Sequence, residues 1–113
     1  MYSKELLKGT LTTIILNLLK DRGRMYGYEI TQAVKEKSTG KILIREGSLY
    51  PALHKMLADG LLSTHEENIG KRIRVYYDLT EKGKAELVLR NDELFSFFDT
   101  IKSILLPESK IYA

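Results

Sequence analysis

The stretch that decides the fold is GSLYPALHKMLA, residues 47–58. Its proline, Pro51, has no N–H and its ring clashes with the carbonyl four residues back, so a helix here must begin close to Gly47. The helical period then turns one apolar stripe inward, formed by Leu49, Leu53, Met56 and Leu57. The outward positions are compact, polar and nearly free of acid, namely Ser48, Tyr50, Pro51, Ala52, His54 and Lys55.

Two further helices are expected before this one, because Gly23, Gly40 and Gly60 each follow an apolar helical period where a C-cap is expected. The second helix, about residues 26–38, has an ordinary amphipathic pattern. The β-branched run at residues 41–45 predicts a short strand. The first helix, about residues 4–21, carries an apolar face nearly two stripes wide, built from Leu6, Leu7, Leu11, Ile14, Ile15, Leu16, Leu18 and Leu19.

A hairpin and a long helix are expected after Gly60. Residues 61–65 and 72–79 are typical of strands, and residues 66–71 of a polar loop between them. Thr80 is a good N-cap for a helix that runs from residue 81 to about 106, where Pro107 stops it. The order of elements predicts a mainly α fold with a small β-hairpin, a winged helix-turn-helix domain at residues 1–79 followed by a C-terminal helix and short tail at 80–113.

Composition excludes several other classes of protein. With 113 residues and 43% hydrophobic content, the chain can bury one core and has no room for a second full domain. It has no cysteine, which rules out disulfides and thiolate zinc sites and fits the cytoplasm. The apolar run at residues 14–19 is broken by Asn17 and is too short to span a bilayer, so neither a signal peptide nor a membrane anchor is expected.

The two histidines, His54 and His65, suggest neither an enzyme nor a metal protein. No nucleophile or carboxylate stands beside them at a spacing that indicates catalysis, and two separated histidines match none of the usual ligand spacings. We therefore predict no catalytic residue, no metal and no cofactor.

The outward face of helix 47–58 suits the major groove of DNA, which admits one helix and is read by hydrogen-bonding side chains near its N-terminal end. On that face alone, DNA reading and an ordinary polar surface are about equally favoured. The hairpin favours DNA, because Lys71, Arg72 and Arg74 make a basic wing beside the helix. The same three cations could instead protect an exposed strand edge, and Glu66 and Glu67 weaken their field.

Four stretches of the chain resemble the PadR-like transcriptional regulators. They are MYGYEI at 25–30, GSLYPALH at 47–54, DGLL at 59–62 and RVYYDLTEKG at 74–83, and the similarity as a whole spans roughly residues 6–83 in order and spacing. The chain departs from the family pattern at Val75, where a basic residue is frequent. Only thirty residues follow Gly83, so the chain resembles the short-tailed group with a single C-terminal helix.

The resemblance implies a homodimeric bacterial repressor that reads a palindromic operator and is released by a small molecule or another cellular signal. It assigns the recognition helix to Ser48, Tyr50, Pro51, His54 and Lys55. It also places the opening of the second helix, Tyr26, Gly27 and Tyr28, close to the DNA backbone.

The last predicted helix carries a coiled-coil-like seam. Leu87, Leu94 and Ile101 recur every seven residues, and a second copy, together with Leu7 and Leu11 of the first helix, is the expected cover. The alternative is a monomer in which this helix folds back on the first. The neighbouring apolar positions are Phe97, Phe98, Ile104 and Leu105.

Two questions about partners stay open at this point. Some short-tailed relatives bind flat aromatic drugs between tryptophans at the dimer interface, but this chain has no tryptophan. Phe95, Phe97 and Phe98 could line an apolar effector pocket there, although plain packing is favoured. The rival to DNA binding is a winged helix used only for protein–protein contact, with its basic surface against an acidic partner.

Overall fold

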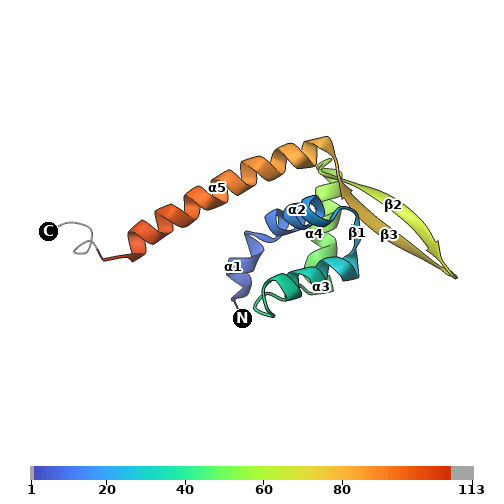
Figure 1. The fold of residues 1–113 in the computed structure, drawn as a ribbon, viewed down its shortest axis with the longest axis horizontal. Coiled ribbons are helices and arrows are strands. Elements are labelled where there is room, and N and C mark those ends of the chain that lie inside the picture. The colour runs from blue at the N-terminus through green and yellow to red at the C-terminus, as the bar shows by residue number, and fades with distance from the viewer. Residues whose placement is uncertain (1, 108–113) are drawn as a thin grey trace.

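The computed structural model describes residues 2–107 and confirms a mainly helical winged helix with a small antiparallel sheet. The long α5 extends away from one side of the domain, and the hairpin projects from the other (Figure 1). Within the described residues, no helix is both long and apolar enough to cross a membrane. The elements in order are α1 (Lys4–Lys8), α2 (Leu11–Arg22), β1 (Met25–Tyr26), α3 (Gly27–Lys37), α4 (Glu46–Ala58), β2 (Leu62–Ile69), β3 (Arg72–Leu79) and α5 (Glu81–Leu105).

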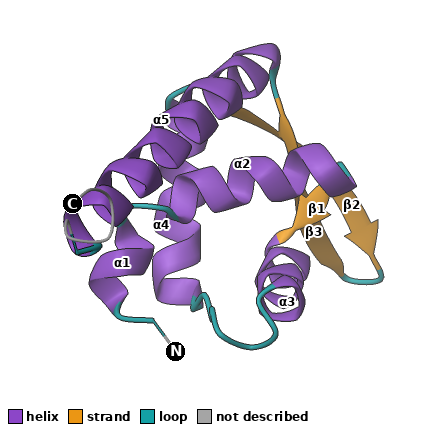
Figure 2. Ribbon diagram, turned by 60° about the vertical axis from the view of Figure 1, so that its left-hand side comes forward, coloured by secondary structure: helices purple, strands orange, loops and turns teal. Residues whose placement is uncertain are grey.

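The core forms around α2, which packs against α3, α4, α5 and β3. Figure 2 shows α2 running through the middle of the molecule, between α5 and α3. Burying this much aliphatic surface is the main favourable term in folding, at roughly 25 cal/mol per Å². The largest fully buried side chains are Ile15, Leu16, Leu19, Ile30, Leu49, Leu53 and Met56.

The first helix is two helices, so the predicted single helix over residues 4–21 is wrong. The chain turns at Gly9 and Thr10, where the Thr10 hydroxyl donates to the carbonyl oxygens of Leu6 and Leu7 at 3.3 and 3.1 Å. Glycine and threonine are poor helix formers, and a hydroxyl that takes up helical carbonyls favours an end at this point. Leu6 is exposed and Leu7 is only partly buried, whereas Leu11 and Ile14 of α2 pack partly against the core.

The short strand was predicted in the wrong place. Residues 41–45 form a loop, held where Ser38 Oγ accepts a hydrogen bond from the Ile42 amide at 2.9 Å. Ile42 and Ile44 still pack against the core, which explains their apolar character. The free edge of β3 pairs instead with β1, Met25 opposite Tyr77 and Tyr26 opposite Tyr76.

The hairpin is longer than predicted, because β2 continues to Ile69 and the polar loop shrinks to Gly70 and Lys71. Gly70 has φ +63°, a left-handed conformation that favours glycine in tight hairpin turns. Residues 66–69 lie beyond the core, where ladder hydrogen bonds alone hold the strand. A polar sequence there does not distinguish strand from loop.

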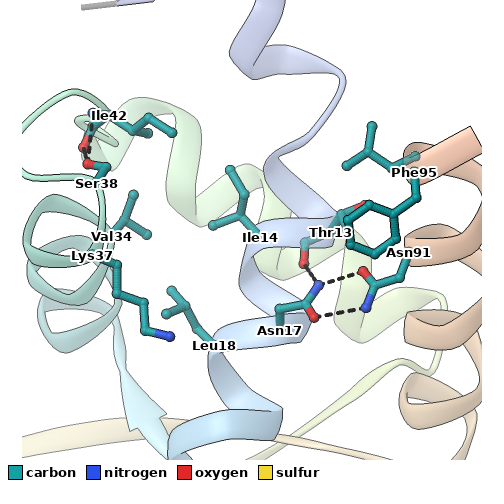
Figure 3. Close-up of a pocket in the computed structure, with 11 residues that line it drawn as sticks. Thr13, Ile14, Asn17, Leu18, Val34, Lys37, Ser38, Ile42, Asn91 and Phe95 are labelled. Atoms are coloured by element: carbon teal, nitrogen blue, oxygen red, sulfur yellow. Dashed lines mark hydrogen bonds between the residues drawn. The ribbon is translucent and has the colours of Figure 1, made fainter. Parts of the chain in front are cut away.

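Hydrogen bonds fix the start of α5 against the turn after α4. The Thr80 hydroxyl accepts from the Gly83 amide at 3.0 Å, as predicted for an N-cap, and donates to the Gly60 carbonyl at 2.6 Å. Two turns further along, Asn17 of α2 and Asn91 of α5 exchange amide hydrogen bonds at 2.8 and 3.0 Å (Figure 3). The two contacts set both the position and the rotation of α5 on the domain.

We expect Gly83→Ala to lower the free energy of unfolding by about 2 kcal/mol, as overpacking of a filled site does. A Cβ at Gly83 would collide with the backbone carbonyl oxygen of Leu61, which cannot swing away as a flexible side chain could. Gly47→Ala is the matched control, since a Cβ there meets nothing within 4 Å. Urea unfolding of both variants measures the difference, and equal midpoints would show that the Leu61 contact is unimportant.

Candidate nucleic-acid interface

The polar face of α4 is presented to solvent as predicted. Leu49, Leu53 and Met56 are buried, whereas the remaining helix positions divide between exposed and partly buried. Ala52 is a correction, because it was expected outward and packs partly against the core. The exposed residues that were assigned to DNA are Ser48, Tyr50, Pro51, His54 and Lys55.

Tyr50 does more than point outward, since its ring lies over Gly27 at the start of α3. A Cβ added at Gly27 would collide with the Tyr50 hydroxyl and stand 2.9 Å from its ring carbon Cζ. Gly27 is itself buried, and its missing side chain leaves the space that the Tyr50 ring occupies. Tyr50 keeps 36% of its surface exposed, and it therefore joins two helices while still facing solvent.

Tyr77 lies beneath this contact on the inner face of the sheet. Burial raises the pKa of the Tyr77 hydroxyl, and the nearby Tyr50 adds to the shift. The Tyr77 ring therefore stays neutral at physiological pH and acts through packing. Tyr28, one residue after Gly27, lies in the first turn of α3, and its side chain is 64% exposed.

The wing carries its three cations in two different settings. Lys71 and Arg72 are exposed at the tip, whereas Arg74, two residues further along β3, is partly buried with its guanidinium carbon 4.0 Å from the centre of the Tyr26 ring. Arg74 Nη1 also donates to the Tyr76 hydroxyl at 3.5 Å, and this hydrogen bond is the largest cause of a raised pKa for Arg74. The Arg74 side chain is therefore both charged and held.

A cleft of about 450 Å³ lies between α4 and the wing. It brings predicted DNA-binding residues from four separate elements, β1, α3, α4 and β3, onto one surface, with no carboxylate among the residues that line it. Lys55 lies outside and is paired with Asp59 at 3.4 Å, one turn on in the helix. The cleft is lined by Tyr26, Gly27, Tyr50, His54, Ile69, Arg72, Ile73, Arg74, Val75 and Tyr77.

A second cavity, of about 470 Å³, opens between α2, α3 and α5 (Figure 3). Its wall is mainly aliphatic, from Ile14, Leu18 and Val34, and the Asn17–Asn91 pair lies at its edge. Phe95 lines this cavity, whereas Phe97 and Phe98 do not. Of the three phenylalanines considered for a pocket, Phe95 therefore lines a cavity within its own chain.

Within residues 2–107, the outer part of α5 carries a broad exposed apolar surface. Leu87 is the exception among the predicted dimer residues, because it is only 4% exposed and belongs to the protomer's own core. Leu94 and Ile101 are partly buried. The exposed members of the predicted seam are Phe97, Phe98, Ile104 and Leu105, with Phe95 beside them.

No functional role was predicted for Tyr76 or for the Asn17–Asn91 pair. Tyr76 meets Tyr26 only because β1 pairs with β3. The strand β1 has two residues, which leave almost no sequence pattern to detect. Asn17 did carry a signal, since it interrupts the apolar run of α2. A polar residue in such a run calls for a buried partner.

Comparisons with known proteins agree on one family. The model of the Transcriptional regulator PadR-like family matches residues 15–88. An uncharacterised protein of Lysinibacillus sphaericus is 30% identical over 108 residues, covering 93% of each chain. A transcriptional regulator of Clostridium thermocellum has a solved structure with a TM-score of 0.86 at 26% identity, covering 91% of this chain and 100% of its own.

Bacillus subtilis PadR has been solved in complex with operator DNA. It has a TM-score of 0.64 at 32% identity, covering 74% of this chain and 46% of its own. The family match at residues 15–88 contains α3, α4 and the hairpin, the elements that build the cleft. This protein therefore belongs to the PadR-like family, whose members are transcriptional regulators and not enzymes.

Proposed function

We propose that this protein is a sequence-specific DNA-binding repressor that acts as a homodimer on a palindromic operator. The observation that carries the proposal is the cleft between α4 and the wing, where Tyr50 and His54 meet Arg72 and Arg74. A helix in the major groove reads base edges, while cations beside it bind phosphates and fix its register. The operator complex of the Bacillus subtilis relative supports the same use of this fold.

The dimer is proposed on the apolar surface of α5. Its uncovered side chains form a patch of the kind that marks an interaction site rather than a free surface. Covering it with a second copy leaves residues 1–79 as the DNA-binding unit and residues 80–113 as the dimerisation unit. Two-fold symmetry would then set the two recognition helices about 34 Å apart, one turn of DNA.

Release of the repressor by a small molecule or another cellular signal is also proposed. The supporting feature is the aliphatic cavity beside Phe95, at the junction of the domain with α5. A ligand there would change the angle between the two units. A regulator of transcription meets its operator in the bacterial cytoplasm, where we place this protein.

Protein–protein contact through the same basic surface is the competing function. A salt titration separates the two, because DNA binding releases condensed counterions and contact with a folded acidic partner does not. With about six phosphates neutralised per dimer, the logarithm of affinity for a random duplex should fall against log salt with a slope near −5. Fluorescence anisotropy measures the slope, and no binding to DNA upstream of its own gene would rule out the repressor.

Gly27→Ala should weaken operator binding about tenfold, a loss of the size expected when one good base or phosphate contact is displaced. The added Cβ pushes the Tyr50 ring out of its place over α3. Tyr50→Phe keeps the packing and is the matched control for folding. If Gly27→Ala lowers the melting temperature but leaves operator affinity unchanged, the Tyr50 position does not matter for DNA.

Phe98→Glu should convert the dimer to a monomer, because it places a charge in the centre of the proposed seam. Phe98 is 46% exposed in the protomer, so its own fold should tolerate the change. Leu89→Glu is the matched control, since Leu89 is also exposed but lies two positions from Leu87, on the opposite side of α5. Light scattering after gel filtration gives both masses, and a dimer in each case would place the interface elsewhere.

A further inference from the structure

We propose that Tyr26 and Tyr76 are positioning residues that hold the Arg74 guanidinium ready to bind a DNA phosphate. The inference rests on the proposed DNA-binding function and adds to it. The two tyrosines would fix the Arg74 side chain before DNA binds. Tyr26 would then affect DNA binding indirectly, by positioning Arg74.

Tyr26 is fixed by its backbone on both sides. Its strand β1 pairs with β3 and sets it opposite Tyr76, while its neighbour Met25 is buried. Its amide donates to Glu29 Oε1 at 3.1 Å, a contact that also caps the start of α3. The rings of Tyr26 and Tyr76 then meet edge to face, with centroids 5.5 Å apart at 78°.

The Arg74 guanidinium lies against this pair of rings. Its carbon is 4.0 Å from the Tyr26 centroid, well inside the range of a cation–π contact. One of its five N–H groups points to the Tyr76 hydroxyl at 3.5 Å. This arrangement leaves the other N–H groups for a phosphate, which arginine can bind through two parallel hydrogen bonds.

Two carboxylates lie on elements beside Arg74, and neither forms an ion pair with it. Glu67 lies opposite Arg74 in the hairpin register, but its Oε1 is 3.6 Å from His65 Nε2. Glu29 accepts the Tyr26 amide. Within residues 2–107 Arg74 makes no ion pair, so its charge is held in place without being neutralised.

Arg72 provides an internal comparison, because it projects from the same face of β3 two residues earlier, is exposed and has no cation–π contact within residues 2–107. A free arginine side chain loses rotamer freedom when it binds a phosphate, whereas one already held loses less. The tyrosines should therefore increase the contribution of Arg74 to DNA affinity and leave that of Arg72 unchanged.

The test is a pair of double-mutant cycles measured by fluorescence anisotropy on a random duplex and on DNA upstream of the gene. We expect Tyr26→Leu to weaken both about threefold with an unchanged salt slope, as loss of an exposed cation–π contact predicts. Arg74→Ala should weaken both duplexes equally and reduce the slope by about one per protomer, as loss of a phosphate contact does. Tyr26→Phe should recover the affinity that Tyr26→Leu loses through Arg74, because it keeps the ring against the guanidinium.

Coupling between the variants decides the proposal. Tyr26→Leu should have no further effect in Arg74→Ala and its full effect in Arg72→Ala. An equal effect in both backgrounds would mean that Tyr26 acts on DNA by itself, and would overturn the inference. A wild type that binds no duplex at low salt would overturn the proposed function instead.

A measurement without DNA keeps the inference testable if Tyr26→Leu folds poorly. Tyr76→Phe removes only the hydroxyl that accepts from Arg74. NMR relaxation of the Arg74 Nε–Hε group in the free protein should then show more motion than in the wild type, while Arg72 is unchanged. An Arg74 side chain as mobile as Arg72 in the wild type would show that nothing holds it.

Discussion

The proposed DNA-binding surface depends on the pairing of two residues, Met25 and Tyr26, with Tyr77 and Tyr76 of β3. This short ladder joins the start of α3 to the base of the wing. The next residue, Gly27, has no side chain and so admits Tyr50 from α4. Three elements that are distant in the sequence therefore meet within three consecutive residues. If the ladder were lost, the wing would keep its own hairpin bonds but not its position beside α4.

The sequence predicted the helical face of α4 and the elements around it, because burial of Leu49, Leu53 and Met56 leaves a strong local pattern. It did not predict β1, because pairing with β3 is a contact across about fifty residues and two residues show no alternation. Residues 41–45 had the composition of a strand but no free edge to pair with. Leu87 followed the heptad of the seam, yet the helix meets its own core there before it leaves the domain.

Electrostatics and packing divide the cations of the surface into two kinds. Lys71 and Arg72 at the tip are solvated and contribute a field that salt screens within about 10 Å. Arg74 is held against aromatic rings, and Lys55 is paired with Asp59. A solvated cation raises the rate of encounter with DNA, but its mobile side chain does little to fix the position of a phosphate. In the proposed complex a held cation would fix where the phosphate lies relative to α4, so Arg74 would determine register more than the tip of the wing does.

The Asn17–Asn91 pair extends the same argument to the proposed dimer. It is a reciprocal amide contact between helices that otherwise pack through apolar side chains, and it satisfies both amides at the edge of a cavity. Apolar side chains would allow α5 to rotate or slide on α2, whereas paired amides accept one register. In a dimer joined through the outer half of α5, a small rotation at Asn91 becomes a large displacement of the distant recognition helix. The spacing of the two DNA half-sites would then depend on two amide groups that never approach the DNA.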